Sequence, residues 1–591
     1  MSNRLTYSIA AILLLTMALL AIFSIKEDTF TFDETAHITA GYSYLVKKDM
    51  RLNPEHPPLI KDIAALPLLF LNLKFPSNHP AWVQKEPPKW WFQFDVGSQF
   101  LYSSGNNPDQ ILFYSRIPMI LILIFMGWFL FFWSKKIFGN KGALLTLFLF
   151  SLSPTFLAHG RLVTTDAAAS LGAVLATYFW IKFLKEPSKK NIILAGLIFG
   201  LSMLFKFSLV LIIPFFITIT LVYAWIKVRN VKKYWFSALK YLALSFLVGV
   251  IGMIFVVWPI YQYHVWNYPL QKQVRDTEFL LSSLRNRPLA ELVTKMAKNP
   301  ILRPYAQFFL GIIMVSQRVS GGNTMYFLGE ISSKGWRNYF PVVYSIKEPL
   351  PFHILTITAL LYLAWLIKKP FWKKPLKRSW VWIDNHFTEF SMLVFIGIYW
   401  AVSINSNLNL GIRHLLPVFP FTMILTAGVI SKFLKQPFLK LKCLFLGILI
   451  FWQIFSVVKI YPHFIAYFNE LIDGPNNGYI YTVDSNLDWG QDLKRLKNWM
   501  DENKIDNIYL DYFGGGNANY YLKNKYISWN GNLKEEKFPR GNYLAISASS
   551  LQGGRGLPAH NFDQPWGYYL WLDKYKPIKK IGYSIFVYYI K

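Results

Sequence analysis

The sequence predicts an all-α polytopic membrane protein that ends in a small soluble α/β domain. Of its 591 residues, 53% are hydrophobic and 18% aromatic, while only 16% are charged. That composition is too apolar for an ordinary soluble globular protein. Apolar runs long enough to cross a ~30 Å hydrocarbon core recur as far as residue 460, and the pattern then changes to short alternating segments.

The first apolar run, 5–25, follows Arg4 and resembles a signal peptide. Its apolar core is long and no small-residue cleavage site follows, so we expect an uncleaved first helix that starts in the cytoplasm. About ten more spanning helices are expected, which makes about eleven transmembrane helices in all. Their expected ranges are 112–133, 142–159, 163–183, 192–205, 208–226, 237–258, 352–367, 388–404, 415–433 and 441–459.

Basic clusters between the apolar runs predict the orientation. The chain carries 62 Lys and Arg against 32 Asp and Glu, a net charge of +30. Clusters of this kind mark cytoplasmic loops, so the charge indicates topology and predicts no nucleic-acid partner. The clusters lie at 134–141, 182–190, 227–233, 368–378 and 432–442.

Alternation along the chain then places three long segments outside: 26–111, 259–351 and everything after residue 460. The apolar stretch 61–75 is too short to span and predicts an interfacial helix. The spacing of Leu493, Leu496 and Met500 predicts a helix, and 507–513, 543–549 and 584–590 predict strands. We therefore divide the chain into a membrane domain, 1–460, and an outer α/β domain, 461–591. The single cysteine, Cys443, excludes an intrachain disulfide and a Cys-based metal site.

Two adjacent acids open the first outer segment. Asp33 and Glu34 follow the first apolar run, and His37 lies one helical turn after Asp33. Solvated loop charges or a helix N-cap would explain them equally well.

A second cluster in the same segment favours a site. Glu55 and His56 precede two prolines, and Lys61 follows. Because the prolines stiffen the backbone, the acid and the histidine hold a fixed direction.

Cations gather at the outer ends of several expected spans. Charged side chains at this depth are costly, so they face a cavity, pair with one another or bind a ligand. Arginine and lysine together suit a buried phosphate, although an Arg161–Asp166 ion pair and a snorkelling Lys206 are alternatives. The candidate residues here are Arg161, Asp166, Lys206, Arg413 and His414. Carboxylates, cations and lipid access together suit a lipid-linked phosphate donor.

At these residues the sequence resembles the polytopic GT-C glycosyltransferases that use polyprenyl-phosphate sugars. The resemblance is to the protein O-mannosyltransferase group, glycosyltransferase family 39, with its bacterial members, which are related to the lipid A aminoarabinose transferases. It covers about residues 5–460 and is carried by "FDETAH" from Phe32, "HPPLIK" from His56, "GRLVTTDA" from Gly160 and "GIRHLLPVFP" from Gly411.

The resemblance implies a GT-C membrane architecture and roles for the site residues. Asp33 would be the general base that takes the proton of an acceptor hydroxyl, with Glu34 in support. Direct attack on the sugar would invert its anomeric configuration. The cations would stabilise the charge of the leaving lipid phosphate.

This sequence departs from the aminoarabinose branch at one position. That branch has an acid and a lysine before the two prolines, whereas here Glu55 is followed by His56, which favours the mannosyltransferase-like branch. In the aminoarabinose branch the matching acid helps to hold a metal, so Glu55 leaves a divalent cation as an alternative, and no cofactor is otherwise expected. The segment 259–351 is too short for the β-trefoil domain of the eukaryotic enzymes.

The tail after residue 460 resembles that of bacterial family members. It offers four polar residues for acceptor contacts: Asp484, Asn486, Asp488 and Gln491. A capped helix start is the alternative explanation of these four.

The sequence thus predicts an integral membrane hexosyltransferase that moves mannose or a similar sugar to a protein hydroxyl on the outer face. A bacterial inner membrane with the site in the periplasm is expected, because Lys, Asn and Ile are abundant and the eukaryotic insert is missing. Transfer to a lipid or a cell-envelope glycan is an alternative. A transporter or flippase of polyprenyl-linked substrates is another, although transporters place ionisable groups at the midplane in paired repeats.

Overall fold

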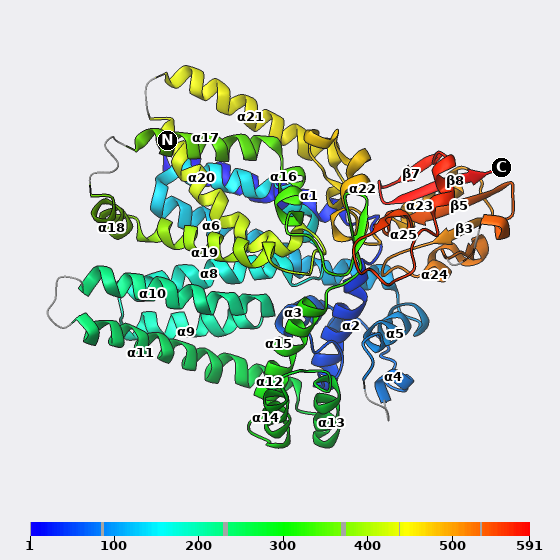
Figure 1. The fold of residues 1–591 in the computed structure, drawn as a ribbon, viewed down its shortest axis with the longest axis horizontal. Helices are drawn as coiled ribbons and strands as arrows, with labels where there is room; N and C mark the ends of the chain where they lie inside the picture. Colours follow the sequence, from blue (N-terminus) through cyan, green and yellow to red (C-terminus); the bar gives the residue numbers. More distant parts are fainter. Residues whose placement is uncertain are drawn as a thin grey trace.

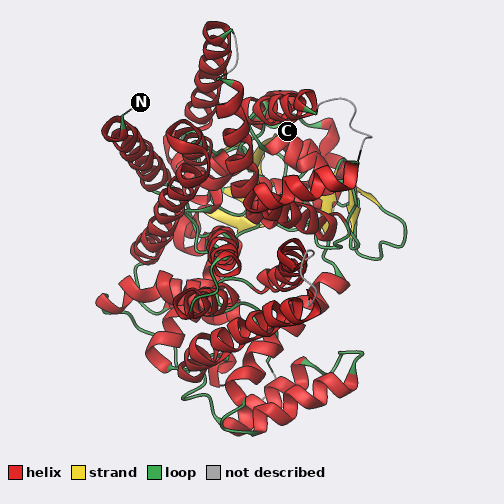
Figure 2. Cartoon of the chain, turned by 90° about the vertical axis from the view of Figure 1, so that its left-hand side faces the viewer, coloured by secondary structure: helices red, strands yellow, loops and turns green. Residues whose placement is uncertain are grey.

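The computed structural model describes residues 2–83, 88–228, 234–367, 374–435, 438–531, 533 and 535–591. Long helices form a bundle at one end of the molecule, and the C-terminal strands lie at the other end (Figure 1). Turned by 90°, the same strands appear behind the helices (Figure 2). Parts of the basic clusters 227–233, 368–378 and 432–442 fall outside the described residues.

The bundle confirms the predicted fold class of a helical, multi-pass membrane protein with a small C-terminal sheet. Within the described ranges, eight helices are long and apolar enough to cross a membrane, or nine if the bent pair α16 and α17 is one span. The bundle contains α1 (Asn3–Ser24), α6 (Pro108–Ser151), α8 (Asp166–Lys185), α9 (Lys189–Met203), α10 (Ile212–Val228), α11 (Tyr234–Gly252), α17 (Leu350–Leu366), α19 (Phe387–Ile404), α20 (Phe419–Phe433) and α21 (Leu439–Ile460).

The difference from about eleven helices lies in α6 and α9. A straight helix of 44 residues would be ~66 Å long, twice the hydrocarbon thickness. Gly139 breaks α6 with φ 72°, and the chain reverses there, since Ser134 Oγ lies 2.8 Å from Thr146 Oγ1 across the two arms. The arms match the expected spans 112–133 and 142–159, and α7 (Pro154–His159) completes the second. Helix α9 has 15 residues, shorter than a full span.

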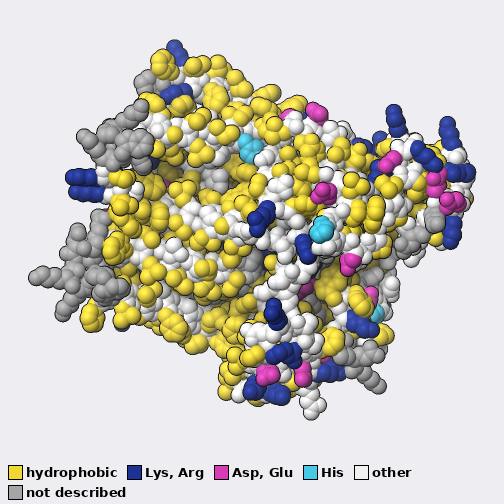
Figure 3. Space-filling view, viewed as in Figure 1, with side chains coloured by type: hydrophobic (Ala, Val, Ile, Leu, Met, Phe, Trp, Pro, Cys, Tyr) yellow, Lys and Arg dark blue, Asp and Glu magenta, His cyan; other side chains and the backbone are white. Residues whose placement is uncertain are grey.

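The surface of the bundle is that of a membrane-spanning part. Hydrophobic side chains cover the part formed by the long helices, while Lys, Arg, Asp and Glu gather over the C-terminal strands and over α13 and α14 (Figure 3).

The segment 26–111 packs helices beside the bundle. It contains α2 (Phe32–Lys47), α3 (Leu59–Ala65), η1 (Leu66–Phe70), α4 (Pro80–Val83), α5 (Phe92–Ser98) and η2 (Gln99–Ser103). The expected interfacial helix 61–75 is shorter than predicted, because the helical turns end at Phe70. Gly41 of α2 makes the close packing with α3 possible, since a Cβ there would lie 2.1 Å from the carbonyl oxygen of Lys61.

The segment 259–351 contains a small helical cluster with its own apolar core. Its elements are α12 (Trp258–His264), α13 (Leu270–Leu280), α14 (Arg287–Lys298), α15 (Arg303–Gly321), β1 (Met325–Phe327), β2 (Glu330–Ser332) and α16 (Tyr339–Lys347).

The C-terminal region forms a five-stranded sheet in the order β4-β3-β5-β8-β7. Strands β3, β4 and β5 run parallel to one another, and β8 runs antiparallel to β5 and β7. The three predicted strands appear as β3 (Ile508–Asp511), β5 (Asn542–Ser547) and β8 (Ile585–Ile590), and the predicted helix appears as α23 (Leu493–Glu502). The remaining elements include α22 (Gly478–Tyr481), α24 (Ala518–Leu522), β4 (Tyr526–Ser528), α25 (Ala548–Arg555), β6 (Leu557–Pro558) and β7 (Lys579–Ile581).

The C-terminal region is joined to the segment 259–351 by strand pairing. Strand β6 pairs in parallel with β2, and β2 pairs with β1. Phe327 of β1 also forms a bridge with Thr482. These contacts bring residues of both segments to the beginning of α2.

Candidate functional site

Two adjoining cavities meet at the beginning of α2. The larger has a volume of about 370 Å³ and the smaller about 110 Å³. Asp33, Arg318, Leu410 and Arg413 line both of them. Asp33 therefore stands where the two cavities meet.

The smaller cavity brings together most of the residues singled out in the sequence. Its predicted members are Asp33, His37, Glu55, His56, Lys206, Arg413 and His414. They come from α2, the loop before α3, the turn after α9 and η5 (Ile412–Val418). Segments far apart in the chain thus converge on one small, cation-rich space.

Asp33 belongs to the first turn of α2. Thr31 and Glu34 form a capping box at this helix start, which fixes the direction of the turn. The Asp33 side chain is 23% exposed, and its Oδ2 lies 3.0 Å from Nη1 of Arg413. The carboxylate is thus held by an arginine while part of it remains accessible from the cavities.

Asp166 organises the cations of the smaller cavity. Its Oδ1 lies 2.5 Å from Nζ of Lys206, and its Oδ2 lies 3.3 Å from Nη1 of Arg413. Arg413 also donates from Nε to Ser485 Oγ at 3.1 Å and lies over the ring of Trp489. Because these partners fix both cations before any ligand arrives, the wall is preorganised for an anion.

Three histidines contribute neutral polar groups to the same cavity. The rings of His37 and His56 meet edge to face at 5.1 Å, and His37 Nδ1 lies 3.0 Å from the carbonyl oxygen of Val163. Burial lowers the pKa of His37 and lowers that of His56 well below its usual value. Nε2 of His414 is buried and has no hydrogen-bond partner within the described part of the chain.

Glu55 is engaged by protein partners rather than by a metal cluster. Its Oε1 accepts from Trp90 Nε1 at 3.0 Å and lies 3.3 Å from Nη1 of Arg318. In the ranges that the structure describes, no three His, Cys, Asp or Glu side chains group as they could for a metal ion. The residues present do not fit the divalent cation that the resemblance left open, and no step is derived through one.

Glu34, the neighbour of Asp33, points into the protein. Its Oε1 accepts from Nε of Arg116 at 2.8 Å and its Oε2 accepts from Nη2 at 2.6 Å. The backbone N–H of Val163 also donates to Oε1 at 3.0 Å. The side chain is fully buried and lines neither cavity.

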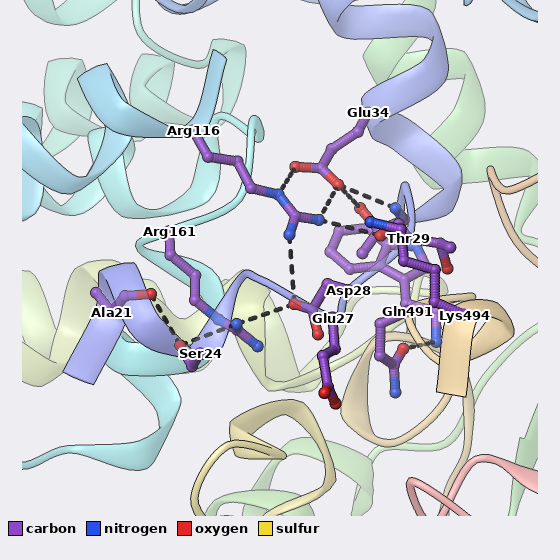
Figure 4. Close-up of polar contacts among 12 residues, drawn as sticks. Ala21, Ser24, Glu27, Asp28, Thr29, Glu34, Arg116, Arg161, Gln491 and Lys494 are labelled. Atoms are coloured by element: carbon purple, nitrogen blue, oxygen red, sulfur yellow. Dashed lines mark hydrogen bonds and ion pairs between the residues drawn. The ribbon is translucent and has the colours of Figure 1, made fainter. Parts of the chain in front are cut away.

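Glu34 belongs to a buried ionic cluster, to which it is joined through Arg116 (Figure 4). Its centre is Asp28, which lies 3.3 Å from Arg116, 2.9 Å from Arg161 and 3.0 Å from Arg495. Arg161 also donates to Ser24 Oγ at 3.0 Å. Arg161 therefore belongs to this cluster and not to the cavity wall, and the Arg161–Asp166 pair considered above is not formed.

Lys61 also lies away from both cavities. Its Nζ donates to Asn53 Oδ1 at 2.8 Å and to the carbonyl oxygens of Asn53 and His56 at 3.0 Å. Burial lowers the pKa of this ammonium to about 7. Lys61 thus fixes the loop that presents Glu55 and His56.

The larger cavity is completed by the C-terminal region. Of the four polar residues predicted there, Asp484 lines the cavity, and burial raises the pKa of its carboxyl to about 6. Asn486 and Gln491 bond to neighbouring backbone groups, and Asp488 accepts from the N–H of Ser549. The alternative of a capped helix start is not observed, because α23 begins after Asp492 without a side-chain cap.

Sequence reasoning missed Arg318 and Trp90, which line the larger cavity together. Arg318 lies near the end of the amphipathic helix α15 and resembles an ordinary surface arginine in the sequence. Trp90 stands among many aromatic residues with no distinguishing spacing. Only the packing of α15 against the Glu55 loop reveals either residue.

One family model matches part of the chain. Residues 109–258 match the family described as dolichyl-phosphate-mannose-protein mannosyltransferase. This match confirms, over the residues that it covers, the resemblance inferred from the sequence. It includes Arg116, Arg161, Asp166 and Lys206, while Asp33 and Arg413 lie outside it. A comparison with curated proteins found no match.

Solved structures show distant likenesses. An oligosaccharyltransferase from Archaeoglobus fulgidus, in complex with Zn and sulfate, is 12% identical with a TM-score of 0.42, over 84% of this chain and 56% of that one. ArnT from Cupriavidus metallidurans, bound to undecaprenyl phosphate, is 10% identical with a TM-score of 0.28, over 100% of this chain and 98% of that one. This chain thus spans 56% of the length of the archaeal protein. These likenesses are too weak to transfer any residue role.

Proposed function

We propose, with the family match over residues 109–258 as the premise, that this membrane protein is a glycosyltransferase. It moves a hexose from a polyprenyl-phosphate donor to an acceptor hydroxyl, with inversion at the anomeric carbon. One observation carries the proposal: the carboxylate of Asp33 stands between a cation-rich cavity and a larger polar cavity. That is where a base has to stand between a phosphate leaving group and an incoming hydroxyl.

The smaller cavity suits the phosphate of the donor. Lys206 and Arg413 form its cationic wall, and Arg318 adds a third positive charge. Both Lys206 and Arg413 are paired with Asp166. The pairing holds the two side chains in place, but it also neutralises part of their positive charge. A phosphate would draw on the remaining N–H donors of Arg413 and on Nε2 of His414, which has no partner among the described residues.

Asp33 acts as the general base. Its carboxylate accepts the proton of the acceptor hydroxyl while the hydroxyl oxygen forms a bond to the anomeric carbon. The bond from that carbon to the phosphate oxygen breaks, and the polyprenyl phosphate leaves with the bonding electron pair. The cations stabilise the charge that grows on this phosphate, which is commonly the largest single contribution to such a step.

Glu34 supports the base indirectly. Its contacts with Arg116 and Val163 anchor the first turn of α2, and that anchoring directs Asp33 toward the cavities. Lys61 acts in the same way on the loop that carries His56. Neither residue is assigned a contact with substrate.

The sugar, the acceptor and the orientation remain parts of the proposal. Mannose is the sugar that the name of the matched family gives. The positive-inside pattern supports an outward-facing site, in a bacterial inner membrane with the site on the periplasmic side. A flippase of polyprenyl-linked substrates is the competing function, and it would require no base beside the phosphate site.

The test is donor consumption by the purified protein. A polyprenyl-phosphate hexose labelled in the sugar is incubated with the protein and a membrane extract that supplies acceptors. Label that moves into an acceptor supports the transferase. If no donor is consumed with any of several hexoses while liposomes containing the protein flip the labelled lipid, the proposal is wrong and the flippase is right.

A further inference from the structure

We propose that the larger cavity receives a carbohydrate, so that the acceptor hydroxyl belongs to a sugar ring of a glycan and not to a polypeptide. This inference rests on the proposed function, since it concerns the acceptor side of the same site. It is carried by the aromatic and polar lining of the cavity and by the closed strand edge beside it.

Aromatic side chains line much of the cavity. Phe32 and Phe513 are stacked at 5.3 Å with an angle of 10° between their planes. Phe32 and Trp90 are stacked at 6.5 Å and 22°, and Tyr568 and Trp489 also line the space. A sugar ring has faces of C–H groups that carry slight positive charge, and these pack on the negative face of an aromatic ring. An aromatic lining of this kind suits a ring that has C–H faces and a polar rim.

Small polar groups stand beside the rings. Hydroxyls and amides come from Asn323, Thr324, Ser549 and Ser550, which are groups that both donate to and accept from sugar hydroxyls. The rim of a sugar ring carries donors and acceptors at close intervals, and this lining offers both in the same small volume. Ser549 Oγ already donates to the carbonyl oxygen of Asp488 and Ser550 Oγ to Asp511 Oδ1, so these two hydroxyls would offer a sugar an acceptor oxygen.

Asp484 supplies the strongest acceptor on this side. Its Oδ1 accepts from the backbone N–H of Ser485 at 2.5 Å, and in the described residues no cation lies within ion-pair distance of it. A carboxylate without a salt bridge can accept from two neighbouring hydroxyls, and such charge-assisted bonds are about twice as strong as neutral ones. Arg413, which contacts Asp33, lies close enough to lower the pKa of Asp484 against the larger effect of burial.

Among the residues that the structure describes, an extended polypeptide finds no free strand edge at the cavity. Peptides commonly bind by adding a strand to an open sheet edge. Here β1 is paired with β2 on one side, and its Phe327 bridges to Thr482 on the other. The volume of about 370 Å³ is also near the lower end of ligand pockets, which run from about 300 to 1,000 Å³. The space therefore suits a compact ring or two better than an extended chain.

Part of the lining of the larger cavity and the pair of Lys206 with Asp166 come from different parts of the chain. Asp484, Ser549 and Tyr568 belong to the C-terminal region, whereas Asp166 and Lys206 lie in the segment that matches the family. The family match therefore supports the donor side alone. The inference about the acceptor rests instead on the lining of the larger cavity, none of which lies in the matched segment.

A competition between two labelled acceptors tests the proposal. The purified protein receives a labelled polyprenyl-phosphate hexose together with fluorescent oligosaccharides (maltotriose and chitotriose) and a fluorescent peptide rich in Ser and Thr. Wild type, Asp484→Asn and Tyr568→Ala are compared with Asp501→Asn, a matched exposed carboxylate on α23. Asparagine tolerates the φ of 54° at position 484, so the main variant keeps its backbone. We expect wild type to transfer label to an oligosaccharide. The rate of this transfer should fall at least tenfold in Asp484→Asn and in Tyr568→Ala and should be unchanged in Asp501→Asn.

Binding without donor separates this inference from the proposed function. Saturation-transfer NMR of the same oligosaccharides should show ring-proton signals with wild type and Asp33→Asn, and weaker signals with Asp484→Asn. Label on the peptide without label on any oligosaccharide would overturn the carbohydrate acceptor and leave the transferase standing. The absence of oligosaccharide binding to wild type would also overturn it. Oligosaccharide binding without any donor consumption would support the carbohydrate site and contradict the proposed reaction.

Discussion

Asp33 and Glu34 are neighbours in the sequence and on the first turn of α2, yet their surroundings differ completely. Asp33 is 23% exposed and reaches both cavities. Glu34 is fully buried and bound at both oxygens by Arg116. Successive residues of a helix point about 100° apart, so one carboxylate faces the site while the next faces the interior.

The comparison teaches that residue type alone does not assign a role. Both acids come from the same motif, and the resemblance gave them related functions. Their partners separate them, because a carboxylate that already accepts from an arginine and from a backbone N–H has little capacity left for a substrate. We therefore propose a part in the reaction for Asp33 alone, while the contacts of Glu34 hold the turn of α2 that carries Asp33.

The largest expected effect is on turnover in Asp33→Asn. The amide has the same shape but cannot take the acceptor proton, so the transfer rate should fall by about 10²- to 10⁴-fold. The thermal midpoint should change little, because Asp33 is partly exposed. The measurement is label transfer from a polyprenyl-phosphate hexose, with donor affinity determined on the same samples. Turnover near the wild-type rate would remove Asp33 from the role of base.

Glu34→Gln should reverse that pattern. The variant leaves the buried guanidinium of Arg116 without its bidentate partner, and removal of one member of a buried ion pair costs about 3 to 5 kcal/mol. Thermal unfolding in detergent should show a lower midpoint than wild type, and an exposed control, Glu502→Gln, should show none of this loss. If Glu34→Gln unfolds like wild type but has lost all turnover, Glu34 takes part in the reaction.

Arg413→Ala probes the cationic wall beside Asp33. It removes the cation shared by Asp33 and Asp166, and a hydrogen bond to a charged group is worth about 1.5 to 3 kcal/mol. Donor affinity should therefore fall about 10- to 100-fold. Lys435→Ala, an exposed cation after α20, is the control. Equal effects of both variants would contradict the proposed phosphate site.

Asp484→Asn should raise stability in a pH-dependent way. Burial raises the pKa of this carboxyl from 3.8 to about 6, so between these values the folded chain holds a proton that the unfolded chain has lost. The ionised form therefore lowers stability above pH 6, by no more than about 3 kcal/mol. The variant should unfold at a higher temperature than wild type at pH 7.5, and the difference should shrink as the pH falls from 6 toward 4. A difference that stays constant with pH would show that the carboxyl does not titrate in this range.

The smallest change tests which side of the membrane the site faces. Cys443, the single cysteine, is exposed at the start of α21 and is expected on the inner side. A Glu502→Cys, Cys443→Ser variant carries its thiol on the C-terminal region instead. An impermeant maleimide should label this variant in intact cells and label wild type only after permeabilisation. The opposite pattern would reverse the orientation.

Much of the fold could be predicted because apolar length and helical period are local properties. The spans, the strands β3, β5 and β8, and helix α23 all follow from such patterns. The reversal of the chain within α6 could be predicted as well, because the basic cluster 134–141 separates two apolar runs and contains Gly139. By contrast, the pairing of β6 with β2 joins segments more than 200 residues apart, and no local pattern indicates it.

Residues of the candidate site could be predicted where a charged side chain lies at the end of an expected membrane span. Lys206, Arg413 and Asp166 could be singled out because a charged side chain near the bilayer is costly unless it pairs, faces a cavity or binds a ligand. Arg161 stood out equally, but its partner, Asp28, lies in another segment, so its structural role could not be read from the sequence. Arg318 looked ordinary and yet lines both cavities.

The most direct test of the account is the anomeric configuration of the product. If Asp33 acts as a base, the hydroxyl attacks the anomeric carbon directly and the sugar is inverted relative to the donor. One-bond C–H coupling at the anomeric carbon of a ¹³C-labelled product, compared with that of the donor, reports the configuration. Inversion is the predicted result. Retention would mean that a covalent sugar intermediate forms first, and it would contradict the role given to Asp33.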